Sequence, residues 1–127
     1  MKREEFVKAV AEMADQVWDF HERWGLGPFD GEDRGHAQSI AARQAILDEE
    51  IRELREAVSS NDGKAICDEA ADVLFVSLGH VQSLQSDGIA GVRRVIAKNA
   101  AKTEKTHKIR PDTGKLLPIA GKPHKWR

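Results

Sequence analysis

The sequence predicts an all-α fold of four helices followed by an irregular C-terminal tail. Apolar residues recur at intervals of three and four through four successive segments, which is the pattern of helices that bury one face. Clusters of Gly, Pro, Ser, Asn and Asp separate these segments and favour turns. The sequence has no convincing run of alternating apolar and polar residues, so no strand is predicted.

The first predicted helix covers residues 3–24 and the second covers residues 37–58, with a glycine-rich loop between them. The positions that define the buried side of the first helix are Phe6, Val10, Met13, Val17, Phe20 (or His21) and Trp24. Those of the second helix are Ile40, Leu47, Ile51, Leu54 and Val58. Each set lies on one side of a helix with about 3.6 residues per turn, so each helix is expected to turn that side towards the core.

The third predicted helix covers residues 64–85. Because apolar side chains occupy much of its circumference, we expect it to be the central helix of the fold. A turn at residues 59–63 precedes it, and Ser86-Asp87-Gly88 is predicted to end it.

The fourth predicted helix covers residues 89–105, and the basic tail that follows, residues 106–127, has too many Pro and Gly residues for a long helix. The chain is therefore expected to form one domain, residues 1–127, with a helical core over residues 3–105. Four helices with short connections are typical of a bundle. The core of such a small bundle is thin, so self-association is expected.

The composition argues against several classes of protein. With 20 Lys and Arg against 21 Asp and Glu, the net charge is −1, so no global field favours nucleic acid or a membrane surface. No apolar run reaches the roughly 20 residues of a membrane span, and the N-terminus lacks an apolar signal stretch. The single cysteine, Cys67, fits a reducing cytosol and is interpreted as a small core residue. We expect a cytoplasmic protein without nucleic-acid or membrane partners.

Two pairs of carboxylates with helical spacing are the most informative feature of the sequence. Glu50 and Glu53 form the first pair, and Glu69 and Asp72 form the second, which begins sixteen residues after the first ends. Residues three apart lie side by side on one face of a helix. If the second and third helices pack antiparallel, four carboxylates converge and supply the oxygen ligands that Mg²⁺ prefers. A metal held in this way points to phosphate chemistry.

An acidic pair on a helix is more often a solvated surface feature than a metal site. The second pair argues against that interpretation, because Glu69 and Asp72 lie in an apolar stretch where a carboxylate without a partner is costly to bury. A cation would offset the repulsion between them. Ala70 and Ala71 keep this part of the helix surface low and leave room for a ligand.

Three polar residues nearer the C-terminus are candidate phosphate ligands. Asn99 and Lys102 share one helical face, and Lys115 follows a predicted turn. Lys and Asn side chains both donate hydrogen bonds to phosphate oxygens. Taken alone, each of these residues is better explained as part of an ordinary polar helix end or turn.

The aromatic group around residue 20 is interpreted mainly as core, since aromatic residues at helical spacing usually pack inside. His21 or Trp24, close to the glycine-rich loop, is the candidate for stacking on a nucleobase.

The combined motifs resemble the MazG-type all-α nucleoside triphosphate pyrophosphohydrolases, whose superfamily includes dimeric dUTPases, dCTP pyrophosphatases and phosphoribosyl-ATP pyrophosphohydrolase. The resemblance rests first on Glu49-Glu50-x-x-Glu53 followed by Glu69-x-x-Asp72. It continues through Phe20-His21, Trp24-Gly25, Arg43-Gln44, Asn99-x-x-Lys102 and Asp112-Thr113-Gly114-Lys115-Leu116-x-Pro118.

The resemblance implies a four-helix protomer that assembles as a dimer or a dimer of dimers. It implies Mg²⁺, with Mn²⁺ as a substitute, and the metal ligands carried over by position are Glu50, Glu53, Glu69 and Asp72. The expected general base is Glu53 or Glu49. The expected phosphate ligands are Asn99, Lys102 and Lys115, and the candidates for base recognition stay His21 and Trp24.

The implied reaction splits a nucleoside triphosphate between the α and β phosphorus atoms and releases a monophosphate and pyrophosphate. The sequence leaves the substrate open among nucleotides of uracil, cytosine or a damaged purine and phosphoribosyl-ATP. Removal of a dUTP-like, dCTP-like or non-standard nucleotide is the preferred interpretation, and it rests on the resemblance alone. The alternative is a non-catalytic helical module that binds nucleotide or protein without turnover.

Overall fold

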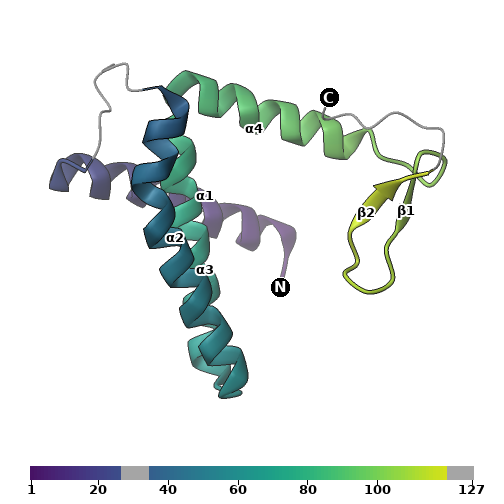
Figure 1. Ribbon diagram of the computed structural model, residues 1–127, viewed down its shortest axis with the longest axis horizontal. Helices are drawn as coiled ribbons and strands as arrows, with labels where there is room; N and C mark the ends of the chain where they lie inside the picture. The colour runs from purple at the N-terminus through teal and green to yellow at the C-terminus, as the bar shows by residue number, and fades with distance from the viewer. Residues whose placement is uncertain (27–34, 120–127) are drawn as a thin grey trace. The chain divides into compact units, whose positions relative to one another are not determined.

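The computed structural model describes residues 1–26 and 35–119 and confirms the all-α prediction. The elements are α1 (Arg3–Trp24), α2 (His36–Ser59), α3 (Gly63–Ser83), α4 (Gln85–Ala100), β1 (His107–Ile109) and β2 (Leu116–Pro118) (Figure 1). The chain divides into two compact units. The first, Met1–Ile89, holds α1, α2, α3 and the start of α4. The second begins at Ala90 and holds the rest of α4 and the two strands.

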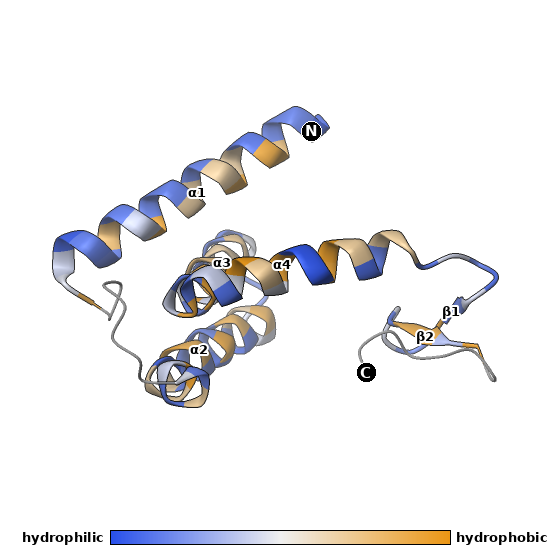
Figure 2. Cartoon of the chain, turned by 90° about the horizontal axis from the view of Figure 1, so that it is seen from above, coloured by the Kyte–Doolittle hydropathy of each residue, from blue (hydrophilic) through white to orange (hydrophobic). Residues whose placement is uncertain are grey.

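The helix α1 has the bounds that the sequence predicts. Its first turn carries Glu4 and Glu5, which interact favourably with the positive end of the helix dipole. Its end is set by Gly25, whose φ of 62° places the backbone in the left-handed region that glycine tolerates best. Polar and apolar residues alternate along α1 with the period of an amphipathic helix (Figure 2).

The helices α2 and α3 pack side by side as an antiparallel pair, because only a short turn joins them (Figures 1 and 2). Asp62 caps α3 by accepting a hydrogen bond from the backbone N–H of Ala65 at 3.1 Å. On α2, the prediction that Val58 faces the core is wrong, since Val58 is 58% exposed and Ala57 is buried instead. One residue corresponds to about 100° around a helix, so Ala57 and Val58 cannot share the face that meets α3.

The helix α3 is in contact with both α1 and α2, which confirms its predicted central position. Val17 of α1 is 2% exposed, the least of any large side chain in the described residues. Cys67, near the start of α3, is exposed, so its interpretation as a core residue is wrong. No helix of the described residues is long and apolar enough to cross a membrane.

The junction between α3 and α4 differs from the prediction. Ser86-Asp87-Gly88 does not end the third helix but lies in the first turns of α4, which starts directly after Leu84. The chain changes direction at Gln85, whose φ is 53°. Gly88 is buried there, and a Cβ at this position would lie 2.3 Å from the carbonyl oxygen of Val81. Glycine at position 88 therefore marks a close approach of two helices rather than a turn.

The helical core ends at Ala100, five residues before the predicted limit of residue 105. The Thr106 hydroxyl accepts a hydrogen bond from the backbone N–H of Thr103 at 3.1 Å, and the Thr103 hydroxyl accepts one from Lys105 at 3.3 Å. Such local side-chain bonds compete with the helical pattern and stop it.

The predicted irregular tail contains an antiparallel hairpin, so the prediction of no strand is wrong for β1 and β2. His107 pairs with Pro118, and Ile109 pairs with Leu116. The turn is closed by a 2.7 Å bond from the Arg110 N–H to the Lys115 carbonyl. Strands of three residues are too short to show a recognisable alternation in the sequence. The part of the predicted tail after residue 119 lies outside the described residues.

Candidate functional site

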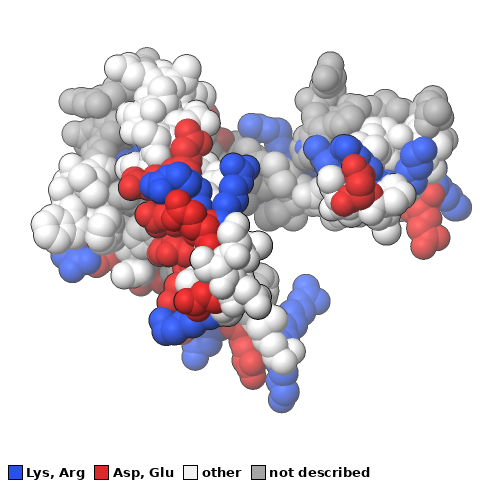
Figure 3. All heavy atoms as spheres, turned by 60° about the horizontal axis from the view of Figure 1, so that its bottom comes forward, with Lys and Arg blue, Asp and Glu red and all other residues white. Residues whose placement is uncertain are grey.

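Three of the four predicted metal ligands come together between α2 and α3. One carboxylate oxygen from each of Glu50, Glu69 and Asp72 lies within 4.8 Å of the others. The spacing of three residues on α3 places Glu69 and Asp72 on one face, and the antiparallel packing brings Glu50 of α2 opposite them. Figure 3 shows acidic side chains gathered over this helix pair, bordered by Lys and Arg.

The oxygen atoms of this cluster are poorly satisfied. Although the side chains of Glu50 and Glu69 are only half-buried, the Oε2 atom of each is shielded from solvent and has no hydrogen-bond partner within the described chain. Burial raises the pKa of Glu50, and the charges of the neighbouring carboxylates raise it further. Burial also raises the pKa of Glu69, followed by the charge of Glu53. Shielded, mutually repelling carboxylate oxygens are a donor set that fits a hard divalent cation.

Glu53 borders this cluster rather than completing it. Its carboxyl is half-buried, and its negative charge helps to raise the pKa of both Glu50 and Glu69. It does not belong to the group of oxygens that meet within 4.8 Å. The position of Glu53 therefore suits a residue beside a bound cation, where it could hold or accept a proton.

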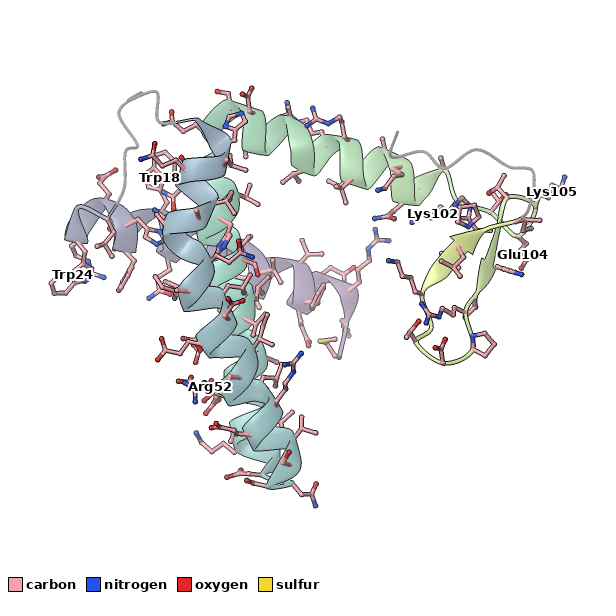
Figure 4. All side chains as sticks on the ribbon, in the orientation of Figure 1. Trp18, Trp24, Arg52, Lys102, Glu104 and Lys105 are labelled. Carbon is pink, nitrogen blue, oxygen red and sulfur yellow. The ribbon has the colours of Figure 1, made fainter. Side chains whose placement is uncertain are left out.

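Glu49 points away from the cluster, as the angle of about 100° between successive helical residues requires. Its side chain is 59% exposed, and one carboxylate oxygen lies 4.0 Å from an Nη atom of Arg52. Arg52 also binds Glu56 at 3.1 Å on the outer face of α2 (Figure 4). Glu49 thus belongs to a surface ion-pair group.

A cavity of about 700 Å³ lies next to the acidic cluster within the first unit, and Glu50 and Asp72 are part of its wall. The other lining residues include Phe20 and His21 from α1, Gln38, Ser39 and Arg43 from α2, and Phe75 from α3. The rings of Phe20 and Phe75 meet edge to face, with centroids 5.5 Å apart. A partly aromatic hollow of this size accommodates a molecule as large as a nucleotide.

The two residues predicted to recognise a base lie in different environments. His21 is 6% exposed and lines the cavity, and its Nδ1 atom lies 2.9 Å from the Gln82 side-chain oxygen. Trp24 is 65% exposed and does not belong to the cavity wall (Figure 4). The structure therefore brings His21, but not Trp24, to the cavity beside the acidic cluster.

Gln38, Ser39 and Phe75 line the cavity, although none of the chemical motifs in the sequence includes them. Ser39 lies about three turns before Glu50 on the same side of α2, whereas Gln38 is about 100° further round the helix. This helical periodicity was available from the sequence, but a polar residue on a helix gives no sign of the cavity that it faces.

The predicted phosphate ligands all belong to the second unit. Asn99 is exposed on the last turn of α4, Lys102 follows that helix, and Lys115 lies in the hairpin turn (Figure 4 labels Lys102). Burial lowers the pKa of Lys98, and the charges of Lys102 and Lys115 lower it further. These three amino groups therefore form a common positive region within this unit.

Comparison with family models matches residues 38–110 to the MazG nucleotide pyrophosphohydrolase domain. Comparison with curated proteins and with solved structures gave no match. The matched segment contains both acidic pairs, Arg43, Asn99 and Lys102. Because it spans more than half of the chain and carries the residues that converge in the structure, the chain belongs to the MazG nucleotide pyrophosphohydrolase domain family.

Proposed function

We propose that the protein is an Mg²⁺-dependent nucleoside triphosphate pyrophosphohydrolase that splits its substrate between the α and β phosphates. The observation that carries the proposal is the convergence of Glu50, Glu69 and Asp72, with two shielded oxygens lacking partners, at the wall of a cavity large enough for a nucleotide. Membership of the MazG family supports the same reaction class.

The proposed metal ligands are Glu50, Glu69 and Asp72, with Glu53 beside them. A bound divalent cation such as Mg²⁺ or Mn²⁺ would offset the charge of the phosphate oxygens and make a water molecule easier to deprotonate. Glu53 is the proposed general base, because its charge acts on Glu50 and Glu69, whereas Glu49 is paired with Arg52 on the outer face. A carboxylate in that place can accept the proton of the attacking water.

The cavity is proposed to hold the nucleoside part of the substrate. Phe20 and Phe75 offer apolar ring surface, and Gln38 and Ser39 can donate and accept hydrogen bonds. Asn99, Lys102 and Lys115 are proposed to bind the phosphates, since the two lysines share one positive region. A dUTP-like, dCTP-like or non-standard nucleotide is the proposed substrate, and its removal from the cytoplasmic pool is the proposed role.

A turnover panel tests the proposal. The purified protein with Mg²⁺ is given each standard and several modified ribo- and deoxynucleoside triphosphates, and the nucleotide products and pyrophosphate are separated. We expect monophosphate and pyrophosphate from one or a few substrates, and no product with EDTA. Glu50→Gln should abolish turnover, whereas Glu56→Gln, which changes an exposed carboxylate on the same helix, should leave it intact.

Release of orthophosphate in place of pyrophosphate would contradict the proposed bond cleavage. A folded protein that binds nucleotide but turns over none of the panel would instead favour the alternative, a non-catalytic binding module.

A further inference from the structure

We propose that His21 is a positioning residue whose ring holds the guanidinium of Arg43 in the cavity wall. The inference rests on the proposed function in that the cavity receives the nucleotide. It assigns to His21 a role different from stacking on the base.

Three elements of the first unit meet at His21. From α1, its Nδ1 atom lies 2.9 Å from Oε1 of Gln82 on α3. Its Nε2 atom lies 3.5 Å from Nη1 of Arg43 on α2, a long contact. Arg43 is fixed a second time by Leu26, whose carbonyl accepts a 2.8 Å hydrogen bond from Nη2. The guanidinium is thus held from two sides.

The tautomer of His21 follows from which of its neighbours donates and which accepts a hydrogen bond. Arg43 can only donate, so the nitrogen that faces it, Nε2, must carry the lone pair. Nδ1 then carries the proton and donates to Oε1 of Gln82. The opposite tautomer would place two N–H donors against each other at Nε2.

Gly79 provides the space that this arrangement needs. A Cβ at this position would lie 2.9 Å from Cε1 of His21 and 3.6 Å from Nη1 of Arg43. Gly79 is itself buried. The edge of the imidazole therefore rests directly on the backbone of α3, between its two hydrogen-bonding partners.

Arg43 is the one Lys or Arg among the residues that the structure places around the cavity, whose wall also contains Glu50 and Asp72. The side chain of Arg43 is half-buried, and this burial lowers the pKa of its guanidinium. The position of this guanidinium decides where the cavity offers positive charge to a ligand. Displacing it should weaken binding more than it slows chemistry.

Two substitutions of His21 separate the two contacts. In Gln, the side-chain amide reaches the place of Nε2, so His21→Gln keeps an acceptor for Arg43. In Asn, the amide occupies the place of Nδ1, so His21→Asn keeps the bond to Gln82 and loses Arg43. With the preferred substrate of the panel, we expect His21→Asn to raise KM about tenfold with kcat little changed. His21→Gln should retain most of the wild-type KM.

A double-mutant cycle tests whether His21 acts through Arg43. In an Arg43→Gln background, which alone should raise KM at least as much, His21→Asn should have no further effect. If the two substitutions instead raise KM by independent factors that multiply in the double variant, the proposal is overturned. That result would favour direct contact of His21 with the ligand. A His21→Gln variant as impaired as His21→Asn would also overturn it.

The tautomer provides a test that needs neither turnover nor a variant. Long-range ¹H–¹⁵N spectra of the wild-type imidazoles in mildly alkaline buffer should show the proton of His21 on Nδ1. A dominant Nε2–H form would overturn the proposal even if the enzyme is active. An Nδ1–H form in a protein that turns over no nucleotide would retain the arrangement and reject only the proposed function.

Discussion

At the scale of single residues, Glu49 and Glu53 lie on different faces of α2. The charge of Glu53 acts on Glu50 and Glu69, the carboxyls that converge with Asp72, whereas Glu49 is exposed beside Arg52. We expect Glu53→Gln to lower kcat by about 10²- to 10⁴-fold, the usual contribution of a general base. Glu49→Gln removes only a surface ion pair and should change kcat by no more than about twofold.

Single-turnover rates at saturating substrate and Mg²⁺ measure this difference. If the two variants lose the same fraction of this rate, the position of a carboxylate on α2 does not determine whether it acts as the general base. An unchanged rate for Glu53→Gln would remove Glu53 from the mechanism.

The raised pKa values of Glu50 and Glu69 predict how metal-free stability depends on pH. The folded protein keeps these protons to a higher pH than the unfolded chain does. Their contribution to stability is therefore fully present at pH below the unfolded pKa and is lost as pH rises through the raised folded pKa. In EDTA, Glu50→Gln should be more stable than wild type at neutral pH, and this advantage should disappear in acid.

Thermal unfolding of the two proteins between about pH 4 and pH 8 spans the ordinary carboxyl range and tests this prediction. Adding Mg²⁺ should remove the advantage of the variant at neutral pH, because metal binding requires the charged carboxylates and stabilises the wild type. A pH-independent difference between wild type and variant would contradict the account.

At the scale of the elements, Gly88 sets how closely the start of α4 approaches α3. A Cβ there would collide with the Val81 carbonyl at 2.3 Å. Gly88→Ala should therefore destabilise the protein by about 1–3 kcal/mol, the usual cost of overpacking. The matched control is Gly91→Ala on the same helix, where the nearest atom would be Arg94 Nη2 at 3.6 Å.

The control should be neutral or more stable by about 0.5–1 kcal/mol, because alanine favours a helix over glycine. Denaturant unfolding followed by circular dichroism compares the two free energies of unfolding. Equal effects at positions 88 and 91 would show that helix propensity, rather than close packing, decides stability at this junction.

The helix bounds show what local patterns can and cannot predict. Both ends of α1 follow from its periodicity and from Gly25. The predicted start of α4 is too late because glycine usually breaks a helix, whereas Gly88 allows close packing inside one. The predicted end of α4 is too late because no apolar periodicity marks the hydrogen bonds that Thr103 and Thr106 make to each other.

At the scale of the whole molecule, the described residues bury few large apolar side chains. Val17 and Ala57 are the buried hydrophobic residues of the described chain. Val92, Val95 and Ile96 on α4 are 37%, 47% and 62% exposed. A monomer that leaves a helical stripe of this kind in water is unfavourable, so we expect self-association as a dimer or a tetramer.

Sedimentation velocity over a range of concentrations measures the assembly. If the α4 stripe forms the interface, Ile96→Glu should shift the protein towards the monomer, because it buries a carboxylate without a partner. Arg94→Glu makes a larger change of charge on another side of α4 and should leave the assembly unchanged. A wild-type monomer at all concentrations would contradict the expectation of self-association.

The sequence by itself determined the four helices, the spacing of the two acidic pairs and, through them, the family. These features depend on neighbours along the chain: a helical period fixes which residues share a face, and Glu69 and Asp72 share one for that reason alone. The family match over residues 38–110 confirmed the resemblance that those motifs carried.

Only the tertiary structure decided which residues meet across elements. It brought Glu50 to the α3 pair, placed Glu53 near them, and joined His21 and Arg43 in the wall of one cavity, with Gly79 leaving room for them. It also paired two three-residue strands in a segment predicted to be irregular. These contacts depend on how helices pack and chains turn in space, and such non-local contacts leave no periodic signal in the sequence.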